Sequence, residues 1–119
     1  FVKKKIMITI YHNPRCTKSR EGLCEIENLN QPFEIRKYLD EPFTKIELEE
    51  VIKKLNISPF ELVRTKESIW IENYKGKELS DTQIVQAMLE NPKLIERPII
   101  INGNKAVIAR PKEKINEIL

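Results

Sequence analysis

The sequence predicts a single α/β domain over residues 1–119, in which a mixed sheet is interrupted by a helical insertion. Three observations predict this class. Short β-branched runs occur near the beginning and in the last part of the chain. Helical periodicities fill most of the sequence between them. Apolar residues make up 40% of the chain, which is enough for one hydrophobic core and too few for two domains.

The first part of the chain is predicted to form a strand, a helix and a second strand. Residues 6–11 are an apolar, β-branched run without helical spacing, which is typical of a buried strand. A turn over residues 12–14 ends it, and residues 16–28 have the apolar periodicity of a helix against a sheet. Residues 33–38 alternate well enough for the second strand. This order builds a right-handed parallel crossover.

Residues 42–95 are predicted to be a largely helical insertion. Three helix starts each carry a cap residue followed three positions later by Glu or Gln: Thr44 with Glu47, Ser58 with Glu61, and Ser80 with Gln83. We expect the helix that begins at Ser58 to end at Arg64. A polar loop over residues 73–77 breaks the insertion, and Asn91-Pro92 ends its last helix.

The last part of the chain is predicted to be a hairpin followed by a helix. Residues 98–102 are a short apolar strand, Asn102-Gly103 is typical of a turn, and residues 105–109 form the return strand. Pro111 opens a terminal helix whose apolar positions are Ile115, Ile118 and Leu119. The predicted order is therefore β-α-β, a helical insertion, then β-β-α.

Composition and charge exclude several classes of protein. Lys and Arg total 21 and Asp and Glu total 18, which gives a net charge of +3. Positive and negative residues alternate along the chain, and this pattern indicates neither a disordered protein nor a basic arm that binds nucleic acid. Two cysteines make no disulfide scaffold. No apolar run approaches the roughly 20 residues that span a bilayer, and the N-terminal residues do not match a signal peptide. We expect a cytoplasmic monomer that binds neither nucleic acid nor membrane.

Cys16 is the leading candidate for chemistry. It lies where the first turn meets the next predicted helix, so the unpaired N–H groups and the positive dipole end of that helix favour a thiolate. His12, Arg15 and Arg20 add positive charge or hydrogen-bond donors nearby. A buried structural cysteine is the alternative, but this combination of turn, helix start and basic neighbours favours a reactive thiol.

The cysteine pattern predicts a single-thiol mechanism. Ser19 occupies the position where a dithiol redox motif carries its second cysteine. Cys24 is eight residues beyond Cys16, about 12 Å along a helix, which is out of disulfide reach. An external thiol would therefore have to recycle Cys16. One His and two Cys make no zinc pattern, and Gly22 stands where a phosphatase-like loop needs Arg.

Three arginines are candidates for an oxyanion site. Arg64 ends a predicted helix, Arg97 directly precedes Pro98, and Arg110 ends the last predicted strand. Residues at such element ends can converge at one edge of a sheet. Guanidinium groups suit a tetrahedral oxyanion because their paired N–H donors have a fixed geometry. The alternative is three solvated surface arginines.

The sequence around these residues resembles one known family. Residues 11–20, Tyr-His-Asn-Pro-Arg-Cys-Thr-Lys-Ser-Arg, are similar to the N-terminal signature of ArsC-type, glutaredoxin-coupled arsenate reductases. Further family blocks match in order at residues 38–42, 62–64, 96–100 and 109–111. The family fold is thioredoxin-like with a helical insertion, which agrees with the predicted order. Well-studied members have Gly directly after the cysteine, so Thr17-Lys18 resembles a less characterised ArsC-related branch.

The resemblance implies roles for seven residues. Cys16 would be the nucleophile, His12 would help to activate it, and Ser19 would support the thiolate by hydrogen bonding. The arsenate-binding residues would be Arg64, Arg97 and Arg110. Pro98 would be the cis-proline that brings the start of a strand close to the thiol. A side chain at position 17 is expected to narrow the anion pocket or alter the amides of the helix start.

The resemblance also implies the partners of the reaction. Arsenate would be reduced to arsenite with glutathione as co-substrate and no bound cofactor, and glutaredoxin would resolve the disulfide between the cysteine and glutathione. Two other functions stay open. One is a Spx-type regulator that binds RNA polymerase, although that group usually has Cys-x-x-Cys and lacks the last arginine, unlike Ser19 and Arg110 here. The other is a monothiol oxidoreductase without arsenic activity.

Overall fold

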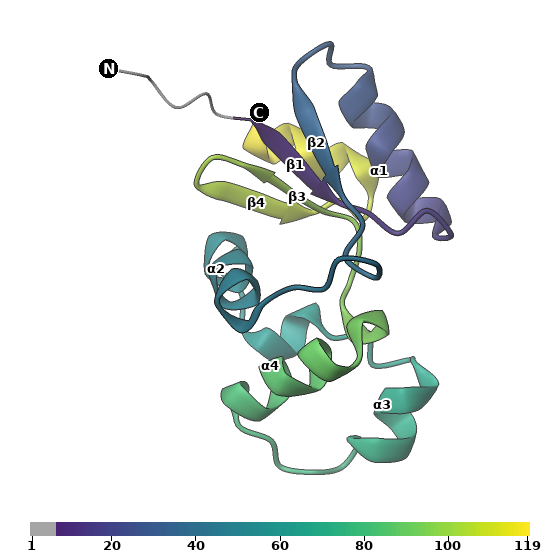
Figure 1. Cartoon of the computed structure of the whole chain (residues 1–119), viewed down its shortest axis with the longest axis vertical. Coiled ribbons are helices and arrows are strands. Elements are labelled where there is room, and N and C mark those ends of the chain that lie inside the picture. Colours follow the sequence, from purple (N-terminus) through teal and green to yellow (C-terminus); the bar gives the residue numbers. More distant parts are fainter. Residues whose placement is uncertain (1–6) are drawn as a thin grey trace. The chain divides into compact units, whose positions relative to one another are not determined.

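The computed structural model describes residues 7–119 and contains a four-stranded mixed sheet (Figure 1). The strands are β1 (Ile8–Tyr11), β2 (Phe33–Arg36), β3 (Ile99–Asn102) and β4 (Lys105–Ile108). Their order is β2-β1-β3-β4; β1 is parallel to β2 and antiparallel to β3, and β3 is antiparallel to β4. The predicted mixed sheet is confirmed. Ile6, the first residue of the first predicted strand, lies outside the described residues.

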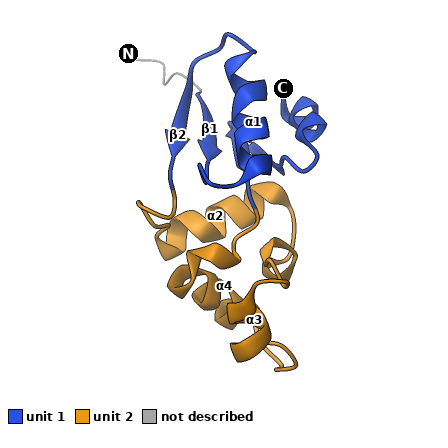
Figure 2. Cartoon of the chain, turned by 90° about the vertical axis from the view of Figure 1, so that its right-hand side faces the viewer, with its two compact units in different colours: residues 1–37, 97–119 blue, residues 38–96 orange. Residues whose placement is uncertain are grey.

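The chain divides into two compact units, coloured separately in Figure 2. The sheet unit consists of residues 1–37 and 97–119, and the helical unit consists of residues 38–96. The helical unit corresponds to the insertion predicted over residues 42–95, with slightly wider bounds. That the two units make one domain stays a prediction.

The core of the sheet unit lies between the sheet and two helices, α1 (Thr17–Glu27) and the 3-10 helix η3 (Lys112–Ile118). Its buried members come from both central strands, β4 and both helices: Ile8, Ile10, Ile26, Ile100, Val107, Ala109, Ile115 and Ile118. Leu119 was expected on this apolar face but is 48% exposed. A 3-10 helix has three residues per turn, so Ile115 and Ile118 share a side and the next residue points elsewhere.

The helical unit is built around the predicted caps. Its elements are α2 (Lys45–Leu55), η1 (Pro59–Leu62), α3 (Ser68–Asn73), α4 (Asp81–Glu90) and η2 (Pro92–Leu94). Capping boxes are present at all three predicted starts, Thr44, Ser58 and Ser80. The short helix α3 was not predicted; its Trp70 is buried and packs against the rings of Phe60 and Tyr74.

One predicted helix end is wrong. The helix that begins at Ser58 is a 3-10 turn that ends at Leu62, so Arg64 lies beyond it. Val63 is extended and pairs with Ile95, and the Arg64 N–H donates to the Leu94 carbonyl at 2.7 Å. This backbone pairing takes the chain out of the helical conformation before Arg64.

The helices show no sign of a membrane span. Over residues 7–119, none of them combines the length and the apolar character needed to cross a bilayer.

Candidate functional site

Cys16 lies at the N-terminus of α1, at the end of a loop over residues 12–16 that follows β1. Its backbone is extended, with φ −96° and ψ 123°, and its carbonyl accepts the first helical hydrogen bond, from the Arg20 N–H at 3.0 Å. The Cys16 N–H donates to the Asn13 carbonyl at 3.0 Å, which closes the turn. The thiol is therefore held at the helix start that the sequence predicted.

The environment of Cys16 favours a thiolate. Burial raises the pKa of this thiol and is the largest single effect. It is outweighed by the backbone amide of Ser19, by the hydrogen bond and charge of the Arg97 guanidinium, and by the backbone amide of Lys18. The pKa of Cys16 is consequently lowered from its ordinary value. A lowered pKa leaves more of the nucleophilic form present at neutral pH.

A buried polar network lies behind the thiol. The polar side chains of His12, Asn13 and Ser19 are buried, and Ser19 is 0% exposed. The Ser19 hydroxyl lies 2.7 Å from His12 Nδ1 and accepts a hydrogen bond from the Asn13 N–H at 3.0 Å. Ser19 was expected to support the thiolate by hydrogen bonding. Its backbone amide lowers the pKa of Cys16, whereas its hydroxyl bonds to His12 and Asn13 and holds the loop. The catalytic role of Ser19 stays a prediction.

The surroundings of His12 favour its neutral form. Burial lowers its pKa most, and the charges of Lys37 and Arg20 lower it further, which outweighs the opposing hydrogen bond with Ser19. A neutral imidazole supplies no positive charge to the thiol. The structure therefore connects His12 to Cys16 through Ser19 and the loop, whereas direct activation of the thiol by His12 stays a prediction.

Replacing Ser19 by alanine is expected to destabilise the protein. The change leaves His12 Nδ1 and the Asn13 N–H buried without their shared partner, and an unsatisfied buried group costs about 1–3 kcal/mol. Urea denaturation measures the free energy of unfolding. Ser68→Ala, at an exposed position in α3, is the matched control. Equal losses in the two variants would contradict the bracing role.

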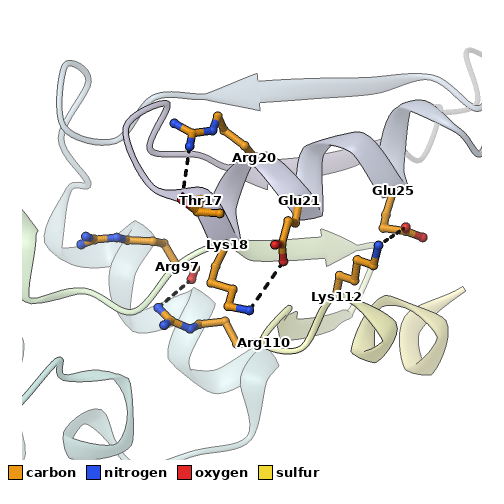
Figure 3. A network of polar contacts seen from close by, with 8 residues as sticks. All are labelled: Thr17, Lys18, Arg20, Glu21, Glu25, Arg97, Arg110 and Lys112. Atoms are coloured by element: carbon orange, nitrogen blue, oxygen red, sulfur yellow. Dashed lines mark hydrogen bonds and ion pairs between the residues drawn. The ribbon is translucent and has the colours of Figure 1, made fainter.

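Two of the predicted arginines lie together in the sheet unit. The guanidinium of Arg97 is one of the groups that lower the pKa of Cys16. Arg110 Nη1 donates to the Arg97 carbonyl at 3.5 Å, a weak hydrogen bond (Figure 3). The peptide bond between Arg97 and Pro98 is cis, as the resemblance implied. The bond between Arg110 and Pro111 is also cis, which the sequence did not indicate. One end of the sheet unit thus presents two guanidinium groups and a thiol.

Gly22 allows α1 to approach Pro98 closely. A Cβ at position 22 would lie 2.7 Å from Pro98 Cγ and 3.8 Å from Ile100 Cδ1. A real Cβ does not tolerate the first distance, so only glycine fits here without movement. This contact holds the helix that carries Cys16 against the chain next to Arg97. Sequence reasoning missed the role of Gly22, although a glycine inside an otherwise regular helix was a signal for it.

Arg64 belongs to the helical unit. Its Nη1 lies 2.9 Å from Glu67 Oε1, and its side chain is 24% exposed. The ion pair orients the guanidinium within its own unit. The role of Arg64 as a third arsenate ligand stays a prediction.

The remaining candidates fall outside this set of contacts. Cys24 is a free, exposed cysteine further along α1. Within the described part of the chain, no group of three or more His, Cys, Asp or Glu side chains is placed to hold a metal ion. The groups around Cys16 are hydrogen-bond donors and cations, which suit an anion.

The first turn of α1 has the charge pattern of an anion site. It contains no acidic residue, although acidic side chains normally stabilise this end of a helix. Lys18 and Arg20 lie there instead, and both are exposed. With a thiolate, helix amides and guanidinium groups together, the site can bind a tetrahedral oxyanion and attack its central atom.

Known proteins are similar to this chain over nearly its whole length. The ArsC family model matches residues 11–118. "Arsenate reductase" from Haemophilus influenzae is 44% identical over 115 residues, which cover 94% of this chain and 98% of that protein. "Uncharacterized protein YfgD" from Escherichia coli K12 is 42% identical over 94% of this chain and 96% of its own.

A solved structure confirms the fold. The structure named "Arsenate reductase from Vibrio cholerae" superposes with a TM-score of 0.91 at 38% identity, covering 98% of this chain and 100% of that one. The family match and the identities above agree with this superposition. The thioredoxin-like arrangement predicted from the sequence is the one observed, and the chain belongs to the ArsC family.

Proposed function

We propose that the protein reduces arsenate to arsenite, with the Cys16 thiolate as nucleophile and glutathione and glutaredoxin as the reducing partners. One observation carries the proposal: the Cys16 sulfur is held by the amides of Lys18 and Ser19 and by the Arg97 guanidinium, which together lower its pKa. The same donors suit the oxygens of a tetrahedral oxyanion. Relatives that are named arsenate reductase support arsenate as the substrate.

The proposed reaction begins with bond formation at arsenic. The Cys16 thiolate attacks As(V), a sulfur–arsenic bond forms, and one arsenate oxygen leaves as water or hydroxide. Arg97 and Arg110 neutralise the oxyanion while this happens, and the positive end of α1 favours the negative charge. Arg64 is proposed as the third arginine that binds arsenate and then arsenite.

Reduction and recycling then use external thiols. A glutathione thiolate attacks the Cys16 sulfur, a disulfide forms between them, and the electron pair of the broken sulfur–arsenic bond stays on arsenic, which becomes As(III). Arsenite leaves. A glutaredoxin thiol attacks the glutathione sulfur of the mixed disulfide and releases the Cys16 thiol. Ser19 in place of a second cysteine, and an exposed Cys24 two turns along α1, support an external reductant.

A coupled assay tests this proposal. Arsenate is added to the protein with glutathione, glutaredoxin, glutathione reductase and NADPH, and the oxidation of NADPH is measured. We expect arsenate-dependent turnover that is lost in Cys16→Ser, kept in the matched variant Cys24→Ser, and lost when either glutathione or glutaredoxin is omitted.

The outcomes separate the candidate functions. If the unmodified protein shows no more arsenate-dependent turnover than Cys16→Ser, arsenate reduction is overturned. Release of glutathione from a glutathionylated peptide, without any arsenate turnover, would identify a monothiol oxidoreductase instead. Arsenate turnover that persists without glutaredoxin would overturn the proposed partner and leave the substrate assignment in place.

A further inference from the structure

The side chain of Arg20 turns back along α1 and bridges the two sides of the Cys16 loop. Its Nη1 donates to the Pro14 carbonyl at 3.1 Å, and its Nη2 donates to Thr17 Oγ1 at 3.2 Å. Figure 3 shows the contact between Arg20 and Thr17. Pro14 precedes the thiol by two residues, and Thr17 follows it by one. We call this arrangement of Arg20, Pro14 and Thr17 the Arg20 clamp.

We propose that Arg20 is a positioning residue for the Cys16 nucleophile. It acts by linking the Pro14 carbonyl, which lies before the thiol, to Thr17, the first residue after it. The inference rests on the nucleophilic role proposed for Cys16. Arg20 itself needs no contact with the substrate or with the sulfur in this role.

The position of the clamp explains how it would act on the thiol. The amides that hold the sulfur belong to Lys18 and Ser19, the two residues directly after Thr17. A contact that fixes Thr17 therefore fixes the start of the helical turn that carries both amides. On the buried side, the same loop is attached to that turn through the Ser19 hydroxyl and the Asn13 N–H. The Arg20 clamp is the corresponding attachment on the exposed side.

The residue types fit a positioning role. The clamp needs two N–H donors at a fixed separation. The planar guanidinium of arginine has them, whereas the ammonium of lysine carries all its donors on one nitrogen. It also needs a hydroxyl at position 17. Helix stability does not explain Arg20, because a cation near the N-terminus of a helix opposes the dipole. Both nitrogens that take part donate to neutral acceptors, one in the loop, the Pro14 carbonyl, and one at the first residue of α1, Thr17 Oγ1.

The test measures the ionisation of Cys16 without arsenate. In a Cys24→Ser background, where Cys16 is the one thiol, the rate of alkylation by iodoacetamide is measured against pH. Arg20→Lys keeps the charge and removes the fork, and Thr17→Val removes the acceptor. The matched controls are Thr17→Ser, which keeps a hydroxyl, and Arg15→Lys, at an exposed arginine beside Cys16.

We expect Arg20→Lys and Thr17→Val each to raise the apparent pKa of Cys16 by about 0.3–0.5 of a unit, which is about a two- to three-fold loss of thiolate below that pKa. The double variant is expected to match either single one, because both remove the same contact. The two controls are expected to keep the original profile. Thermal unfolding of all variants checks that the fold is unchanged.

Three results would overturn the proposal: unchanged profiles in both variants, an equal shift in Arg15→Lys, or an unchanged profile with a raised KM for arsenate, which would make Arg20 a substrate ligand. The readout does not depend on arsenate. A protein that shifts its profile as expected but turns over no arsenate would therefore refute the proposed function and keep the clamp.

Discussion

Replacing Arg97 by methionine is expected to lower kcat/KM for arsenate by about 10²- to 10³-fold, the usual cost of losing one charged or hydrogen-bonding donor at a developing oxyanion. Arg97 has two tasks in the proposed reaction. Its guanidinium is one of the groups that lower the pKa of Cys16, and it is one of the two arginines at that end of the sheet unit. Loss of the side chain therefore affects both the nucleophile and the anion.

The pH dependence separates these two tasks. Because Arg97 lowers the pKa of Cys16, its removal raises that pKa, so the pH profile of alkylation moves to higher pH. The two proteins differ most below the ordinary cysteine pKa of about 8.5 and converge where both thiols are fully ionised. Arg110→Met is expected to raise the KM for arsenate without moving this profile, because Arg110 is not among the groups that shift the pKa of Cys16.

Arg15→Met is the control for the loss of an exposed arginine near the thiol. We expect it to keep both the alkylation profile and kcat/KM close to those of the unmodified protein. An Arg97→Met variant that is indistinguishable from Arg15→Met in both measurements would show that Arg97 serves neither the thiol nor the oxyanion.

Replacing Gly22 by valine is expected to lower the free energy of unfolding by about 3 kcal/mol, at the upper end of the cost of overpacking a core. The new Cβ would start 2.7 Å from Pro98 Cγ, and Pro98 is fully buried, so α1 and the chain around Pro98 must separate. Better helix propensity than glycine recovers only a few tenths of a kcal/mol. Urea denaturation measures the loss.

The same variant is expected to affect the chemistry, because Arg97 directly precedes Pro98. If the helix and this segment separate, the Arg97 guanidinium moves away from the sulfur and the pKa of Cys16 rises. Cys24→Val places the same side chain at an exposed position of the same helix and is the matched control. Equal stability of the two variants would mean that the close approach at Gly22 does not matter.

Local patterns predicted those parts of the fold that depend on neighbouring residues. The three capping boxes begin helices where the sequence placed them, because a cap is satisfied within four residues. The apolar run of β1 became a central strand, and Cys16 is at a helix start because a turn and a periodic segment meet there. The helix α3 was missed because its N-cap, Glu67, makes no side-chain capping bond and the helix has six residues.

The parts that could not be predicted depend on contacts between distant segments. Nothing in the sequence near Ser19 shows that its hydroxyl is hydrogen-bonded to His12 and to the Asn13 N–H. The close approach of Gly22 to Pro98 arises only when α1 packs against the segment that precedes β3. The arginines at the ends of predicted elements included Arg97, and the resemblance to a family added Pro98. The effect of Arg97 on the pKa of Cys16 became visible only in the three-dimensional structure.

The neutral network behind the thiol determines how the nucleophile responds to acid. The groups that stabilise the thiolate are two backbone amides, which do not titrate, and a guanidinium, which stays charged throughout the physiological range. The pKa of His12 is lowered, chiefly by burial, which favours its uncharged form. The groups that lower the pKa of Cys16 therefore keep their charge over the neutral range, and we expect the reactivity of the thiol to follow its own ionisation.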